Sequence, residues 1–236
     1  MNKLKVIGNL VQNLKEIYNE KLVSVILYGS CAGDECENNF SDINTIVVLD
    51  NLLAIDLKNA NPALKDLMKT KHPLPLFMDK EEWFNSCDVY PIEYSDMKDR
   101  YKILYGEDIV KPLVLEKKNL RLQCEHETKN LLIKLRQNYL AQSGDLKAIE
   151  SLLKTCSKSF FALFRATLRL TEPKISFNHS VSINALSEKV KIDKNVFLKL
   201  LDFRTDSSAI PKSEYEITVQ KLIDSTDEIL KYIDKI

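Results

Sequence analysis

Oxygen-bearing side chains lie at the end of one apolar run and at the start of the next, near the start of the chain, at a spacing that suits phosphate and metal chemistry. The first run ends in Gly29-Ser30, and the second opens on Asp42, Ile43 and Asn44. A Gly-Ser turn lets the backbone approach a ligand closely, and it offers N–H groups and a hydroxyl to phosphate oxygens. Because side chains alternate along a strand, Asp42 and Asn44 are expected to share one face while Ile43 points into the core. Their oxygens suit Mg²⁺ bound against those phosphates.

Hydrophobic periodicity predicts the elements that must position these side chains. The two runs are rich in β-branched residues and predict buried strands, joined by a polar loop over 31–41. Two prolines, Pro73 and Pro75, lie at the start of a short strand further along, which favours an edge position. The predicted order is helix 3–19, strand 22–28, strand 43–49, helix 52–70, strand 74–78, helix 80–86 capped by Asp79, strand 89–95 and a short helix over 96–105.

The residues Val25–Ser30 and Asp42-Ile43-Asn44 resemble the signature of the polymerase-β-like nucleotidyltransferases. That signature is an apolar strand, Gly-Ser, a gap of about a dozen residues, and Asp-x-Asp or Asp-x-Glu on a second strand. The chain departs from it at one position, because Asn44 stands where the family has its second metal-binding carboxylate.

The third carboxylate of the family comes from a later strand beside the first two. The stretch Pro91–Tyr94 looks like that strand in the aminoglycoside-modifying branch, so the resemblance assigns the third carboxylate to Glu93. Asp96 is the alternative if the register differs by a few residues. The run Tyr105–Asp108 also resembles a family segment, the one that precedes a C-terminal helical domain.

Strand signals stop after residue 117, and helical patterns continue at 117–142, 146–171, 181–190, 193–203 and 213–234. Short connections between them predict an antiparallel bundle. The expected fold class is α+β, with an N-terminal nucleotidyltransferase-type mixed β-sheet flanked by helices over 1–114 and a C-terminal all-α helical bundle over 115–236. Arg165 and Arg169 lie on the most apolar helix, where an ion pair is the preferred interpretation and a triphosphate contact the alternative.

The amino-acid composition argues against nucleic acid and membranes as binding partners. The 236 residues carry a formal net charge of zero, so no overall field favours nucleic acid or an anionic membrane. No run approaches the roughly 18 apolar residues of a membrane span. The start of the chain lacks an apolar signal core, and the five cysteines are scattered. We therefore expect a cytoplasmic protein with reduced thiols, no zinc site and no membrane or nucleic-acid partner.

The resemblance implies a role for each candidate residue. Gly29 and Ser30 would bind the nucleotide through its β- and γ-phosphate oxygens. Asp42, Asn44 and Glu93 would face the metal, and Asp42 and Glu93 would be the catalytic residues. An active member of the family uses two Mg²⁺ ions, whereas Asn44 leaves one or none here. The partners implied are an NTP and an unidentified small-molecule or protein acceptor; the oligomeric state stays open.

Three hypotheses about function remain at this point. The first is a Mg²⁺-dependent nucleotidyltransferase that transfers a nucleoside monophosphate to a hydroxyl. The second is a catalytically degenerate nucleotide-binding or regulatory module, because Asn44 removes one charge from a dication site. The third is a structural partner protein of the toxin–antitoxin type. Each site residue also has a structural alternative: Gly29-Ser30 as an ordinary turn, Asp42 as a strand cap, and Glu93 as an exposed edge carboxylate.

Overall fold

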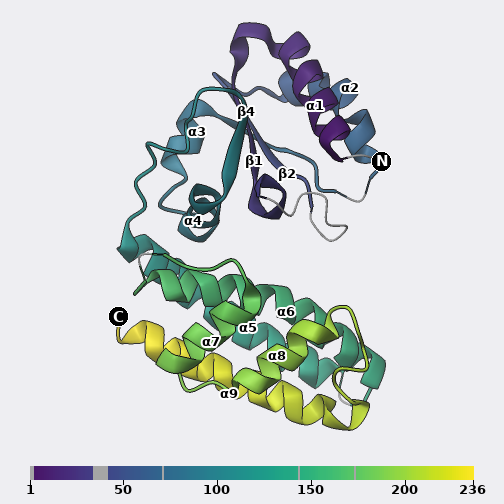
Figure 1. The fold of residues 1–236 in the computed structure, drawn as a ribbon, viewed down its shortest axis with the longest axis vertical. Helices are drawn as coiled ribbons and strands as arrows, with labels where there is room; N and C mark the ends of the chain where they lie inside the picture. Colours follow the sequence, from purple (N-terminus) through teal and green to yellow (C-terminus); the bar gives the residue numbers. More distant parts are fainter. Residues whose placement is uncertain (1–2, 34–41, 71, 143, 173) are drawn as a thin grey trace. The chain divides into compact units, whose positions relative to one another are not determined.

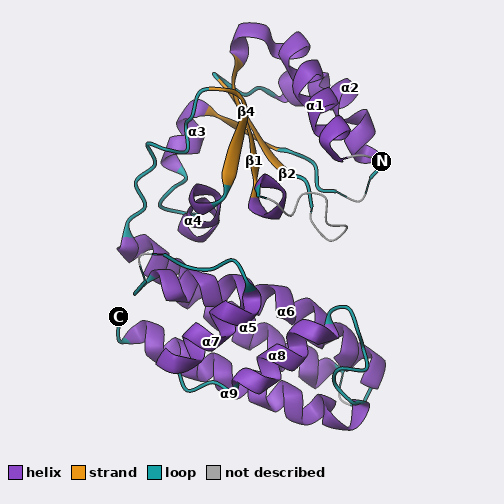
Figure 2. Cartoon of the chain, viewed as in Figure 1, coloured by secondary structure: helices purple, strands orange, loops and turns teal. Residues whose placement is uncertain are grey.

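The chain forms two compact units, Met1–Glu116 and Lys117–Ile236 (Figure 1). The computed structural model describes residues 3–33, 42–70, 72–142, 144–172 and 174–236. Strands occur in the first unit, whereas the described part of the second unit is built from helices (Figure 2).

A mixed four-stranded sheet forms the centre of the first unit in the described residues. Its strands are β1 (Leu22–Tyr28), β2 (Asn44–Leu49), β3 (Leu76–Asp79) and β4 (Tyr101–Gly106), in the order β3-β2-β1-β4. β1 pairs antiparallel with both β2 and β4, while β2 pairs parallel with β3. The predictions for 22–28 and 43–49 are therefore confirmed, and the predicted edge strand begins two residues later than expected.

Helices cover both faces of this sheet. α1 (Lys3–Tyr18) and α2 (Ala54–Met68) pack on one face, where Val25 and Val47 join their apolar side chains. α3 (Lys80–Asn85) and α4 (Pro91–Asp99) pack on the other, which we call the α3/α4 face, where Ile26 and Val48 meet Trp83. The alternation of side chains along β1 and β2 thus divides one sheet between two cores.

The predicted strand over 89–95 and the predicted helix over 96–105 are both wrong. Residues Pro91–Asp99 form helix α4, and Tyr101–Gly106 form strand β4 at the edge of the sheet. Pro91 begins the helix, where its fixed φ is already helical and its missing N–H would have no partner within the helix. Glu93 lies in the first turn, where the helix dipole stabilises a negative charge. The run of apolar residues at 89–94 is too short for its periodicity to separate a strand from a helix.

The second unit is a helical bundle, as predicted. Its long helices are α5 (Lys117–Ala141), α6 (Leu146–Arg169), α7 (His179–Lys189), α8 (Lys194–Phe203) and α9 (Tyr215–Asp234). α6 lies at its centre, in contact with α5, α7, α8 and α9. Its aromatic side chains pack edge to face, with Phe160 and Phe164 both against Phe197 of α8. None of the helices in the described ranges is both long and apolar enough to cross a bilayer.

The expectation of reduced thiols is wrong for Cys31, which is disulfide-bonded. Cys87, Cys124 and Cys156 are free thiols. Burial raises the pKa of the Cys156 thiol to about 12, so it stays protonated at neutral pH. Most of the predicted polar loop over 31–41, including Cys36, lies outside the described residues.

The junction between α1 and α2 yields a prediction about pH and stability. Lys21 Nζ lies 2.6 Å from the buried Asp56 carboxylate, which also accepts the Leu53 N–H at 2.8 Å. The hydrogen bond from Lys21 has the largest effect, and together with the bond from the Leu53 N–H it lowers the pKa of the Asp56 carboxyl below its ordinary value. The stability they contribute is therefore present above the ordinary carboxyl range and is lost as the pH falls through the lowered value. We expect Asp56→Asn to cost about 2 kcal/mol at pH 7 and much less in acid.

Urea unfolding followed by fluorescence of Trp83, the single tryptophan, measures this effect because its buried side chain reports the first unit. Asp66→Asn is the matched control, since Asp66 is an exposed carboxylate of the same helix. It should cost clearly less at pH 7. An Asp56→Asn penalty that does not change between neutral and acid pH would contradict the prediction.

Candidate functional site

The Gly-Ser turn at the end of β1 has a backbone that favours glycine. The turn, η2 (Gly29–Ala32), follows Tyr28 directly, and Gly29 has φ +75°. A side chain at Gly29 would be strained by this conformation, and its Cβ would lie 3.4 Å from Nδ2 of Asn44. The first residue of β2 therefore lies directly beside the turn.

The sheet places Asn44 on the α3/α4 face. Ile43 is fully buried against Ile7 and Leu67, on the side of α1 and α2. Because neighbouring residues of a strand point to opposite faces, Asn44 points toward the α3/α4 face, as Ile46 and Val48 do. Asn44 is paired with Tyr28 of β1, so its backbone position is set by the sheet.

Asp42 lies two residues before β2 and carries an accessible carboxylate. Its side chain is 59% exposed, and Oδ1 lies 3.4 Å from Nδ1 of His72. Within the described residues this histidine is its hydrogen-bond partner, so the alternative that Asp42 caps the strand gains no support. His72 is not among the candidate residues of the sequence analysis, because no sequence signal links two positions 30 apart.

Glu93 approaches the α3/α4 face from a helix rather than from a strand. It is exposed on the first turn of α4. Burial, and next the charge of Glu93, raise the pKa of the Tyr28 hydroxyl. Tyr28 is partly buried in the core of the α3/α4 face and is the sheet partner of Asn44. α4 packs on the face to which Asn44 points, so Glu93 is carried by a helix of that face, and Asp96 follows one turn later on α4.

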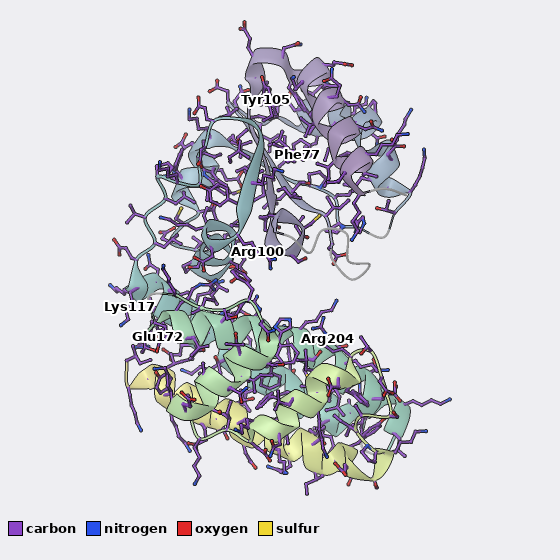
Figure 3. The ribbon with its side chains drawn as sticks, in the orientation of Figure 1. Phe77, Arg100, Tyr105, Lys117, Glu172 and Arg204 are labelled. Atoms are coloured by element: carbon purple, nitrogen blue, oxygen red, sulfur yellow. The ribbon has the colours of Figure 1, made fainter. Side chains whose placement is uncertain are left out.

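Arg100 is a residue near the turn that the sequence patterns did not single out. It lies between α4 and β4 (Figure 3), and its carbonyl oxygen accepts the Gly29 N–H at 3.0 Å. Its guanidinium packs on Gly33, where an added Cβ would lie 2.8 Å from Cζ. Phosphate sites commonly contain cations, which could have prompted a search for an arginine in the sequence. That rule does not distinguish Arg100 from the other arginines of the chain.

Asp42, Asn44 and Glu93, if they act together, carry fewer charges than the Asp-x-Asp pattern that the sequence resembles. Asp42 and Glu93 offer carboxylate oxygens and Asn44 offers an amide oxygen, which are ligand types that Mg²⁺ prefers. In the part of the chain that the structure describes, no three His, Cys, Asp or Glu side chains gather closely enough to hold a metal ion. Any Mg²⁺ here would therefore depend on Asn44 and on phosphate oxygens of a bound nucleotide.

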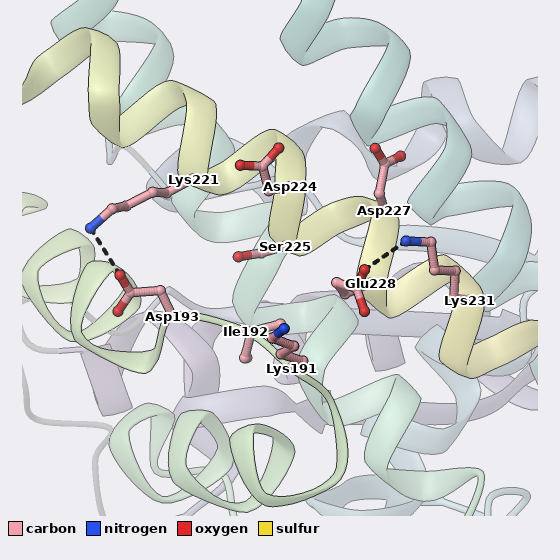
Figure 4. Close-up of a pocket in the computed structure, with 9 residues that line it drawn as sticks. All are labelled: Lys191, Ile192, Asp193, Lys221, Asp224, Ser225, Asp227, Glu228 and Lys231. Atoms are coloured by element: carbon pink, nitrogen blue, oxygen red, sulfur yellow. Dashed lines mark hydrogen bonds and ion pairs between the residues drawn. The ribbon is translucent and has the colours of Figure 1, made fainter.

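A separate surface hollow of about 550 Å³ lies on the second unit, between α9 and the Lys191–Asp193 segment (Figure 4). Its charged groups are largely paired with one another. Lys221 contacts Asp193 at 2.9 Å, and Lys231 contacts Glu228 at 2.6 Å. Mixed and mutually neutralised charge gives no preference for one class of ligand, so the hollow is a weaker candidate than the turn.

Comparison with known proteins identifies the fold. No family model and no curated protein matches the sequence. The structure is similar to the crystal structure of spectinomycin adenyltransferase AAD(9) from Enterococcus faecialis with ATP and spectinomycin, with a TM-score of 0.60 and 15% identity. The match covers 96% of this chain and 100% of that one. The fold is thus the two-part fold of that enzyme, which confirms the predicted fold class.

Proposed function

We propose that this chain is a nucleotidyltransferase-like protein that uses Mg²⁺ to transfer a nucleoside monophosphate from an NTP to a hydroxyl of a small molecule or a protein. The observation that supports it most directly is the positive-φ Gly29-Ser30 turn beside Asn44. Asp42 carries an exposed carboxylate just before β2, and Glu93 carries one on α4, the helix that packs on the face to which Asn44 points. The shared fold with an adenyltransferase crystallised with ATP supports the same class of substrate.

The proposed roles follow from the chemistry of each group. Gly29 and Ser30 bind β- and γ-phosphate oxygens through backbone N–H groups and the hydroxyl. Asp42, Asn44 and Glu93 would hold Mg²⁺, which when bound supplies positive charge to the phosphates and lowers the pKa of the acceptor hydroxyl. The acceptor oxygen attacks the α-phosphorus, the bond to the bridging oxygen of the β-phosphate breaks, and pyrophosphate leaves. Glu93 takes the hydroxyl proton.

Asn44 is the observation that favours a second candidate, a nucleotide-binding or regulatory module without turnover. An amide contributes a neutral oxygen where the reaction benefits from a full negative charge beside the metal. Such a protein would keep the turn and the fold, bind the nucleotide, and release it unchanged. Binding and turnover must therefore be measured separately.

The test of function has two stages. Calorimetry with ATP, GTP, CTP and UTP, with and without Mg²⁺, measures whether and how the chain binds nucleotide. Incubation with α-³²P-labelled NTP and candidate acceptors, with pyrophosphate release as a second readout, measures transfer. Mg²⁺-dependent binding with transfer supports the enzyme. Binding without transfer to any acceptor supports the regulatory module, and absence of nucleotide binding contradicts both.

Restoring the carboxylate at position 44 should strengthen metal binding. We expect Asn44→Asp to raise the affinity for Mg²⁺ or Mn²⁺ in the presence of ATP about tenfold, equivalent to about 1.4 kcal/mol. Mn²⁺ titration followed by electron paramagnetic resonance measures free and bound metal directly. Asn51→Asp is the control, because it adds the same charge to an exposed position after the other end of β2. Equal metal affinity in both variants would show that residue 44 does not face a metal.

A further inference from the structure

Arg100 contacts both ends of the Gly29–Gly33 turn. Its backbone carbonyl accepts the N–H of Gly29 at 3.0 Å. Its guanidinium lies against Gly33, so closely that an alanine Cβ there would sit 2.8 Å from Cζ. Gly33 has φ −103°, a conformation open to any residue. The space taken by the guanidinium, rather than backbone strain, is therefore what favours glycine at position 33.

The sheet accounts for this placement. Tyr101 of β4 is paired with Tyr28 of β1, and the two strands are antiparallel. The residue before Tyr101 must then lie beside the residue after Tyr28, which is Gly29. Position 100 also ends α4, so the side chain starts from a backbone held by a helix on one side and a strand on the other. Such a cation is positioned before any ligand arrives, which lowers the entropy cost of binding.

A turn that binds triphosphate oxygens needs positive charge nearby, and N–H groups and a hydroxyl supply only dipoles. The planar guanidinium of arginine donates two parallel hydrogen bonds to a phosphate. We propose that Arg100 binds the β- or γ-phosphate of the nucleotide held at the Gly29-Ser30 turn. This inference rests on the proposed function, and it adds a binding residue that the Gly-Ser and Asp-x-Asn motifs do not include.

The structure offers two ways to disturb this contact. Arg100→Gln removes the guanidinium and keeps the backbone carbonyl that accepts the Gly29 N–H. Gly33→Ala keeps the charge and displaces the guanidinium, because the end of a flexible side chain must move away from the new Cβ. Lys102→Gln is the matched control, since it removes one positive charge from an exposed residue of β4.

The measurement is calorimetric binding of ATP, AMP and adenosine to the full chain with Mg²⁺. We expect Arg100→Gln to weaken ATP binding about 10- to 100-fold and to leave adenosine binding unchanged. Gly33→Ala should weaken ATP binding less, and it should add nothing in the Arg100→Gln background because both changes act through one group. Lys102→Gln should bind all three ligands as the wild type does.

The outcomes separate this inference from the function it rests on. If the wild type binds no nucleotide, the proposed function fails, and the role of Arg100 with it. If the wild type binds ATP and Arg100→Gln binds it equally well, only the role of Arg100 is overturned. Equal weakening of ATP and adenosine, or additive effects of the two substitutions, would show that Arg100 and Gly33 merely support the fold of the turn.

Discussion

Asp42→Ala is expected to lower Mg²⁺-dependent nucleotidyl transfer at least about 100-fold and to leave the fold intact. The carboxylate brings a full negative charge to the end of β2, where Asn44 brings none. Without it, two of the three proposed ligands remain and only Glu93 is charged. The loss should appear in the Mg²⁺ dependence of ATP binding as well as in the rate.

Stability should change little, because the Asp42 side chain is 59% exposed and its partner, His72, lies at 3.4 Å. Exposed pairs of this kind contribute about 0–1 kcal/mol. Thermal unfolding followed by Trp83 fluorescence checks this point, and Asp50→Asn is the control because it removes a charge from the far end of the same strand. Loss of the folded state in Asp42→Ala would favour a structural role for Asp42. Unchanged transfer would remove it from the site.

Gly106→Ala is expected to destabilise the first unit by about 3–4 kcal/mol, the largest stability effect that we predict. Gly106 has φ +81°, which costs an L-residue about 1–2 kcal/mol. Its Cβ would also lie 2.9 Å from the carbonyl carbon of Val23, a backbone atom that cannot move without shifting β1. Relief of that collision would separate β1 from β4 where Ser24 is paired with Gly106.

Gly144→Ala separates the two contributions. Gly144 has φ +86° and no atom within 4 Å of an added Cβ, so only the backbone conformation is penalised there. It lies in the second unit. Circular dichroism follows the helices of both units, whereas Trp83 fluorescence follows only the unit that contains Gly106, so the difference between the two signals reports the second unit. We expect the Gly106→Ala penalty to exceed that of Gly144→Ala by about 2 kcal/mol. Equal penalties would show that the contact with Val23 is relieved without cost.

Local sequence patterns were sufficient to predict secondary structure where buried positions recur at regular spacing. Periodicity predicts the strands at 22–28 and 43–49 and the helices of the second unit. Each helix buries one apolar stripe and each of these strands buries both faces. The helix cap at Asp79 was also predicted, and its side chain accepts the N–H of Glu82. Between residues 89 and 106 the pattern was short and ambiguous, and there the order of helix and strand was reversed.

Some residues of the candidate site could be predicted from local sequence patterns and others could not. Gly29-Ser30 and the Asp42–Asn44 segment could be selected from sequence because both lie at strand ends, where alternation predicts the face to which each side chain points. Their roles in the site remain predictions. Glu93 was selected by resemblance, on the wrong kind of element. His72 and Arg100 could not be selected at all, since each meets its partner across a loop or a strand pairing that no local pattern describes.

The sequence by itself determined which segments are strands and helices in most of the chain, because burial of an apolar face depends on neighbours a few residues away. Only the tertiary structure decided which side chains gather around the Gly29-Ser30 turn. Arg100 lies there because β4 pairs with β1. Glu93 is carried by α4, the helix that covers the face to which Asn44 points. Contacts between residues so far apart depend on how the elements pack, and packing is a property of the whole unit.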